Sequence, residues 1–316
     1  MNVVYSEEPP QARLIYLLGA GASYPALPLA QDVPSEMLAW GVKIDEEESV
    51  YADSQARGSI KKMAAELKRW GHAAKQHYSV DTLAKKLFLL RQSNELWQLK
   101  ATLSAFFMLR QSLSPAARRY DSFFAALLEG PAYPPAFPKT VGILTWNYDR
   151  QLERAYHQYC PDWRRVQEVI TFSSQLVRPN GLLGRAIDKG TGEEYNLNFE
   201  SGKLEVYEFV SQEFEALLTH FPTMRFAFEP NGGELEKFRR LAGKADTLVV
   251  IGYSFPFFNR QEDRSILEAL PAVRRVFIQV LPQDAKAVEA RMRSLRDFPQ
   301  MQFIEDQALF FVPHDF

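Results

Sequence analysis

The sequence predicts an α/β fold in which helices flank a parallel β-sheet. Two observations lead to this prediction. Short, continuous apolar runs alternate with longer amphipathic segments, which is typical of strand-helix units. Each apolar run also ends in polar or turn-forming residues before a helical pattern begins. With 46% apolar and 24% charged residues among 316, the chain can bury a large core. The length also allows two domains, but we interpret 1–316 as a single domain with an insertion.

Four apolar runs predict buried parallel strands, and a weaker run near the C-terminal end predicts another. The four are Leu14–Leu18, Thr140–Thr145, Thr247–Ile251 and Arg275–Leu281, and the weaker one is Met301–Ile304. Helices are expected after the first four strands, at Gln31–Trp40, Arg150–Tyr159, Arg260–Leu270 and Gln283–Leu295.

Two segments depart from this alternation. Ser59–His77 and Asp81–Leu113 carry apolar residues at three- and four-residue spacing, which predicts a helical insertion over about 41–130. Leu182–Val210 alternates over shorter runs separated by Lys-Gly-Thr-Gly and Glu-Ser-Gly-Lys. That pattern predicts a small antiparallel meander within a β-rich subregion over about 176–230.

Charge and cysteine content exclude several classes of function. The formal net charge is only −2, so no overall field attracts nucleic acid, and we expect no nucleic-acid partner. Cys160 is the single cysteine, which excludes an internal disulfide and a multi-thiolate zinc site, so we expect no metal and a reducing cytoplasm. No apolar stretch approaches the ~20 residues that span a bilayer, so we expect no membrane association.

The first predicted strand ends in a glycine-rich turn, Gly-Ala-Gly-Ala-Ser, at residues 19–23. Gly19 allows a sharp turn, and Gly21 allows the backbone to approach a ligand without a Cβ. Ser23 adds a hydroxyl, and a following helix would direct its unpaired N–H groups toward a phosphate. The dinucleotide fingerprint would place a third glycine where Tyr24 stands. A tight strand-to-helix turn therefore remains the alternative to a Rossmann-like phosphate loop.

Two more predicted strands end in polar residues. TWNYDR at 145–150 places Asn147 and Asp149 at the carboxyl end of one strand, and IGYSFPFFNR at 251–260 follows another. Ligands of open α/β sheets bind at the carboxyl ends of the strands. Three such ends on one edge favour a nucleotide-binding crevice.

The order and spacing of GAGAS with Leu-Pro following, TWNYD and IGYS resemble those of the sirtuin-like NAD-binding proteins, from Leu14 to about Leu281. The greatest similarity is to the bacterial branch that lacks the zinc ribbon of the deacetylases. YSVDTLAKKL at 78–87 is also similar to a stretch of those proteins. The resemblance implies an NAD-binding protein that hydrolyses NAD to nicotinamide and ADP-ribose, in bacterial anti-phage defence or a stress response.

The resemblance also implies a role for each matching residue. The diphosphate and nearby ribose would be lined by Gly19, Ala20, Gly21 and Ser23. A loop covering the cofactor would include Leu27 and Pro28. Asn147 would sit by the nicotinamide ribose and position a water, and Asp149 would hold the carboxamide. The adenosine side would be contacted by Gly252, Tyr253 and Ser254. Oxocarbenium-like glycosidic cleavage needs such polar groups rather than a strong nucleophile.

The sequence departs from the family at a catalytic position. The family carries a His-Gly pair after its Asn-Tyr-Asp motif, whereas QLVRPNGLLG places Asn180 before Gly181. Asparagine cannot take up a proton near neutral pH. Gln279 stands where relatives carry Asn, and one cysteine cannot build the four-cysteine module of the deacetylases.

Two hypotheses follow from this departure. In the first, the protein is an NAD hydrolase in which Asn180 is tolerated or replaced by another group, with control by a protein partner or homo-oligomerisation. In the second, it is a non-catalytic module that binds NAD, ADP-ribose or a related nucleotide as a sensor or scaffold. An ionisable group beside Asn147 would favour the enzyme.

Overall fold

A six-stranded, all-parallel sheet lies at the centre of the chain. The computed structural model describes residues 11–130, 133–184, 202–220, 222–230 and 233–314. The strands are β1 (Leu14–Leu18), β2 (Val141–Thr145), β3 (Leu176–Val177), β4 (Thr247–Ile251), β5 (Arg275–Gln279) and β6 (Gln300–Phe303). The predicted α/β fold with a parallel sheet is thereby confirmed. Only the two-residue β3 was not expected.

The strand order is β3-β2-β1-β4-β5-β6, the order of a doubly wound Rossmann-like sheet. The chain builds outward from β1 to β3 and then returns to place β4 on the other side of β1. Leu18 pairs with Thr145 of β2 and with Ile251 of β4, so these three strands end level with one another. The switch point between β1 and β4 is where such sheets bind ligands.

Alternating side chains of the strands enter two separate apolar cores. Leu14, Tyr16 and Leu18 enter one core, and Ile15 and Leu17 enter the other, as the two-residue period of a strand requires. The first core is covered by α6 (Arg118–Leu127), α7 (Gln151–His157) and α8 (Trp163–Val166). The second is covered by α10 (Glu234–Ala242), α11 (Arg260–Glu268) and α12 (Ala285–Leu295).

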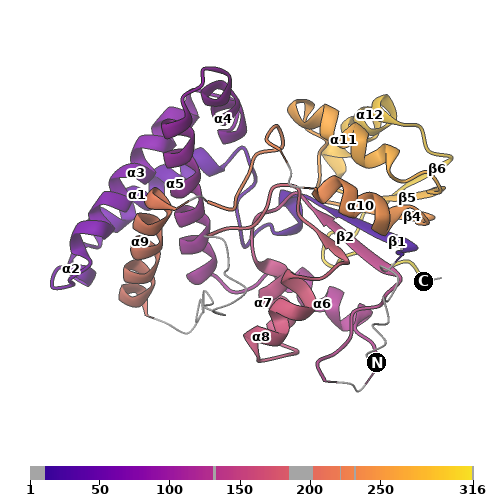
Figure 1. Ribbon diagram of the computed structural model, residues 1–316, viewed down its shortest axis with the longest axis horizontal. Helices are drawn as coiled ribbons and strands as arrows, with labels where there is room; N and C mark the ends of the chain where they lie inside the picture. The colour runs from indigo at the N-terminus through magenta and orange to yellow at the C-terminus, as the bar shows by residue number, and fades with distance from the viewer. Residues whose placement is uncertain (1–10, 131–132, 185–201, 221, 231–232, 315–316) are drawn as a thin grey trace, which may run out of the picture.

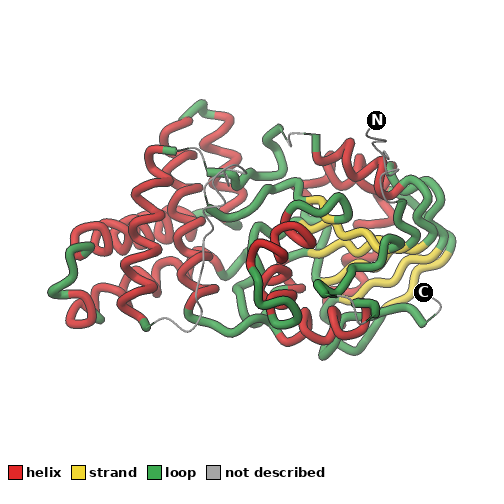
Figure 2. The backbone as a smooth tube through the Cα atoms, turned by 60° about the horizontal axis from the view of Figure 1, so that its bottom comes forward, coloured by secondary structure: helices red, strands yellow, loops and turns green. Residues whose placement is uncertain are grey.

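A helical lobe lies beside the carboxyl ends of the strands (Figures 1 and 2). Its members are α1 (Val33–Glu46), α2 (Glu48–Tyr51), α3 (Arg57–Lys75), α4 (Val80–Leu89), α5 (Ser93–Ser112) and α9 (Lys203–Thr219). Helix α5 is buried on almost every side, because α3, α4 and α9 all pack against it. Among the described residues, no helix is long and apolar enough to cross a membrane.

The predicted antiparallel meander over Leu182–Val210 is wrong where the structure describes it. Residues 203–210 form the start of α9, and residues 185–201 lie outside the described part of the chain. Tyr207, Val210, Phe214 and Leu217 are all buried against the helical lobe. Their spacing of three and four residues is that of a helix, and it outweighs the short alternation that precedes it.

Candidate functional site

The loops that follow β1 and β4 touch through their backbones. The amide of Gly19 donates to the Ile251 carbonyl at 3.0 Å, and the amide of Gly21 donates to the Gly252 carbonyl at 3.0 Å. A Cβ on Gly21 would lie 2.8 Å from the Gly252 Cα. Gly252 has a φ of +61°, and a Cβ there would lie 2.3 Å from the Ala22 nitrogen. Only glycines therefore allow this approach.

The glycine loop after β1 is partly accessible, and the Arg119 side chain contacts its backbone. Ala20 and Gly21 are partly exposed in the 3-10 turn Ala20–Ala22. Arg119 of α6 donates from Nη1 to the Gly21 carbonyl at 3.0 Å. Its guanidinium places a positive charge at the loop, which favours an anionic ligand there.

A polar cluster joins the β1 loop to the segment after β2. Asn147 donates from Nδ2 to the Gly19 carbonyl at 2.9 Å, and this atom is 3.3 Å from Ser23 Oγ. Ser23 in turn donates to Asp149 Oδ2 at 2.7 Å, and its Oγ is 3.2 Å from the Tyr120 hydroxyl. Two motifs more than 120 residues apart therefore form one hydrogen-bonded network.

Asp149 is buried, and its surroundings hold it in place. The backbone amide of Gln151 donates to Asp149 Oδ1 at 2.9 Å, and Arg178 donates to the Asp149 carbonyl at 2.8 Å. Burial raises the pKa of the Asp149 carboxyl, although the hydrogen bonds from Gln151 and Ser23 and the nearby Arg178 act in the opposite direction. Arg178 also pairs with the buried Glu153 at 2.7 Å.

Asn180 contacts the backbone at the carboxyl end of β2. Its Nδ2 donates to the Trp146 carbonyl at 2.9 Å, one residue before Asn147. Its Oδ1 is buried, and no described residue donates a hydrogen bond to it. Asn180 therefore reaches the edge predicted for it, but its amide is already committed to the backbone.

His157 and His220 contact residues outside this network. His157 stacks on Trp163 with ring centroids 4.2 Å apart, and Nδ1 of His220 is 2.9 Å from the Thr219 hydroxyl. His72 belongs to α3, and His77 follows that helix.

The other predicted cofactor contacts lie in more varied surroundings. Tyr253 stacks on Trp146 at a centroid distance of 5.9 Å, and its hydroxyl donates to Asp263 at 2.7 Å. Ser254 is exposed, whereas Pro28 is buried. Leu27 is also buried and packs in the core of the helical lobe.

Three residues of this network were missed by sequence reasoning. Tyr120 and Arg119 come from α6, and Arg178 follows the short strand β3. Arg178 lies only two residues before the predicted site residue Asn180, but no sequence pattern predicts its hydrogen bond to the backbone of Asp149.

Gln279, where relatives carry Asn, donates to the Leu309 carbonyl at 2.6 Å and so holds the C-terminal segment.

A pocket of about 160 Å³ lies beside the site, between the sheet and helices α10 and α11. Trp146 and Pro179 line it together with Glu234 and Glu262. The indole N–H of Trp146 is buried and has no hydrogen-bond partner among the described residues. This volume is similar to that of a cavity that holds one benzene ring.

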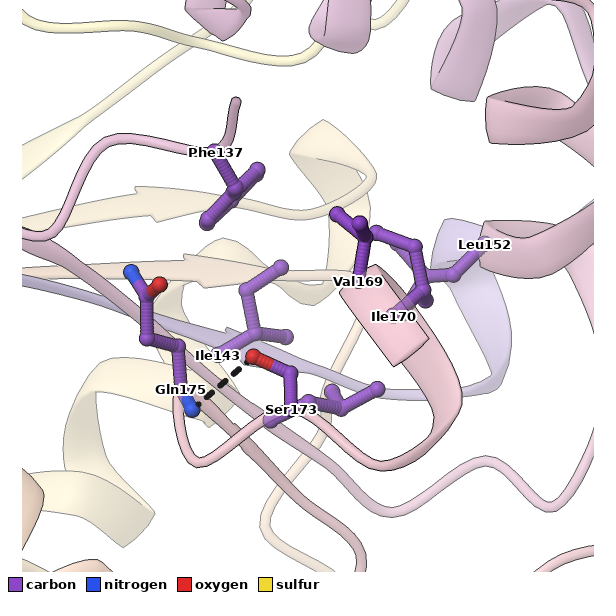
Figure 3. A pocket seen from close by; sticks show the side chains of 8 residues that line it. Phe137, Ile143, Leu152, Val169, Ile170, Ser173 and Gln175 are labelled. Atoms are coloured by element: carbon purple, nitrogen blue, oxygen red, sulfur yellow. Dashed lines mark hydrogen bonds between the residues drawn. The ribbon is translucent and has the colours of Figure 1, made fainter. Parts of the chain in front are cut away.

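A second, apolar hollow of about 10 Å³ lies under Phe137 and Ile143 (Figure 3). It is large enough for about one water, so it is not a site for a nucleotide.

Within the described ranges, no three His, Cys, Asp or Glu side chains are grouped so as to hold a metal ion. No protein-family model matches the chain, and no curated protein matches it. Support for a function therefore comes from the geometry of the site and from the resemblance of its motifs.

Proposed function

We propose that this protein binds NAD at the switch point between β1 and β4 and hydrolyses it to nicotinamide and ADP-ribose. The observation that carries the proposal is the meeting of three strand ends. The glycine loop after β1, the Asn147–Asp149 segment after β2 and Gly252 after β4 are joined by hydrogen bonds or backbone contact. A role in bacterial defence or stress response depends only on the resemblance of the motifs.

The proposed residue roles follow from accessibility and charge. Ala20 and Gly21 are open to a ligand, and the Arg119 charge suits a diphosphate. Asn147 is partly exposed at the strand end, which supports its proposed contact with a ribose or a water. Both oxygens of Asp149 already accept hydrogen bonds, so its first role is to hold Ser23.

Asn180 favours a second candidate function. An amide cannot act as a proton acceptor near neutral pH, and the Nδ2 of Asn180 is bound to the Trp146 carbonyl. If no other group performs the proton transfer, the protein is a non-catalytic module that binds NAD, ADP-ribose or a related nucleotide.

Release of nicotinamide from NAD distinguishes the two functions. The purified protein is incubated with NAD beside Asn147→Ala and, as a control, Asn94→Ala, which changes an exposed asparagine near the start of α5. The hydrolase requires release that is lost in Asn147→Ala and kept in Asn94→Ala. No release, together with a nucleotide-dependent rise in Tm, supports the binding module. Neither release nor a Tm rise would refute both.

A further inference from the structure

The C-terminal segment, residues 304–314, packs against helix α6. Phe310 is buried, and its ring centroid lies 4.9 Å from that of Tyr120 and 5.5 Å from that of Phe123. The hydroxyl of Tyr16 on β1 donates to the Phe311 carbonyl at 3.3 Å. The segment that follows the last strand of the sheet therefore contacts both the first strand and α6.

The buried amide of Gln279 fixes this segment beside the loop after β4. Its Nε2 donates to the carbonyls of Asp306 and Leu309 at 2.5 and 2.6 Å, and its Oε1 accepts from the Phe311 amide at 3.2 Å. The backbone carbonyl of Gln279 accepts from the amide of Gly252 at 2.9 Å. One residue thus joins the C-terminal segment to a glycine of the candidate site.

The ring of Phe310 supports the two residues of α6 that reach the candidate site. The guanidinium carbon of Arg119 lies 4.6 Å from the centroid of this ring, and Arg119 Nη1 donates to the Gly21 carbonyl at 3.0 Å. Tyr120 packs edge-on against the same ring, and its hydroxyl is 3.2 Å from Ser23 Oγ. Phe310 therefore lies behind both side chains.

The orientation of the Arg119 guanidinium depends on this ring. Its Nε and Nη2 are buried and have no hydrogen-bond partner among the described residues. Burial lowers the pKa of Arg119 and the charge of Asp306 raises it, but a guanidinium stays ionised at neutral pH. The Gly21 carbonyl and the ring face of Phe310 orient this cation, and neither carries a charge that would neutralise it.

We propose that Phe310 is a positioning residue, whose ring holds the Arg119 guanidinium at the glycine loop so that its charge acts on the diphosphate of a bound nucleotide. This inference rests on the nucleotide binding of the proposed function and is independent of NAD cleavage. The C-terminal segment then completes the site, although Phe310 itself does not touch the ligand. Its effect falls on ligands that carry a diphosphate, because Arg119 acts on that group.

The test compares Phe310→Leu with Phe311→Leu. Both changes remove one ring from the C-terminal segment, but the ring of Phe311 packs on Phe277 of β5, with centroids 4.7 Å apart. We expect Phe310→Leu to raise the Kd for ADP-ribose, measured by calorimetry, about tenfold. Phe311→Leu should leave this Kd unchanged. Binding of adenosine, which lacks the diphosphate, should be the same in all three proteins by NMR titration.

A double variant tests whether Phe310 acts through Arg119. Arg119→Met should weaken ADP-ribose binding at least as much as Phe310→Leu does. Adding Phe310→Leu to Arg119→Met should then cost nothing further, because the cation that the ring orients is already absent. Thermal unfolding without ligand shows that each variant folds, and Phe310→Met, which fills more of the space, replaces Phe310→Leu if that variant does not.

The outcomes separate this inference from the proposed function. Equal losses in Phe310→Leu and Phe311→Leu, a parallel loss of adenosine binding, or a full further loss in the double variant would make Phe310 a structural residue only. A wild type that binds ADP-ribose but releases no nicotinamide from NAD would refute the hydrolase and leave the role of Phe310 intact. A wild type that binds neither ADP-ribose nor NAD would overturn both.

Discussion

Gly252→Ala should destabilise the protein and close the candidate site. An L-residue at the φ of +61° costs about 1–2 kcal/mol. The new Cβ would lie 2.3 Å from the Ala22 nitrogen and 2.6 Å from the Gly21 Cα, both backbone atoms that cannot rotate away. Relieving such a contact typically costs a further 1–3 kcal/mol or so. We therefore expect the free energy of unfolding to fall by about 2–5 kcal/mol.

Urea denaturation followed by tryptophan fluorescence measures this loss. Gly58→Ala is the control, because a Cβ at this exposed position near the start of α3 meets nothing within 4 Å. It should leave stability unchanged or raise it by up to about 1 kcal/mol. The proposed function requires an NAD-dependent rise in Tm, and this rise should disappear in Gly252→Ala and persist in Gly58→Ala. A Gly252→Ala variant as stable as the wild type would refute the close backbone approach of the two loops.

Two further predictions concern buried charge. Arg178→Met leaves Glu153 buried without its cation, so the free energy of unfolding measured by urea denaturation should fall by about 3–5 kcal/mol. In the double variant, Glu153→Gln should recover part of this loss. A loss below about 1 kcal/mol would show that the ion pair does not hold the site. Asp81 lies in the first turn of α4, and burial raises its pKa from the ordinary 3.8 to about 6. The folded protein therefore holds this proton more tightly than the unfolded chain does, and its free energy of unfolding should fall as the pH rises from 4 through 6. The free energy of unfolding of Asp81→Asn should therefore match that of the wild type at pH 4 and exceed it at pH 8. The difference should be at most about 3 kcal/mol, and smaller because solvent reaches part of the side chain. An Asn variant that is less stable than the wild type at pH 8 would contradict this.

The elements that sequence reasoning predicted well are those with strong local signals. Leu14–Leu18 and Thr247–Ile251 are continuous apolar runs, and both are strands with those bounds. Leu176–Val177 is too short for any period to be visible, so β3 was missed. Lys203–Val210 alternates over a few residues, and the helical spacing that decides its structure becomes visible only when Phe214 and Leu217 are included.

The same distinction applies to the candidate site. Gly19, Gly21 and Asn147 could be predicted as neighbours, because parallel strands bring their carboxyl ends to one edge. The contacts of Tyr120 and Arg178 are tertiary, and they depend on how α6 and the segment after β3 pack on the sheet.

Helix α9 gives the helical lobe an unusual dependence on chain order. The lobe's other helices lie between β1 and β2, whereas α9 comes after β3 and packs against α3 and α5. During synthesis, the apolar faces of the earlier helices stay uncovered until residues 203–219 have been made. A fragment ending before α9 would expose the apolar surface that α9 covers, so we expect residues 33–112 alone to aggregate. Folding of the lobe is thereby coupled to completion of half of the sheet.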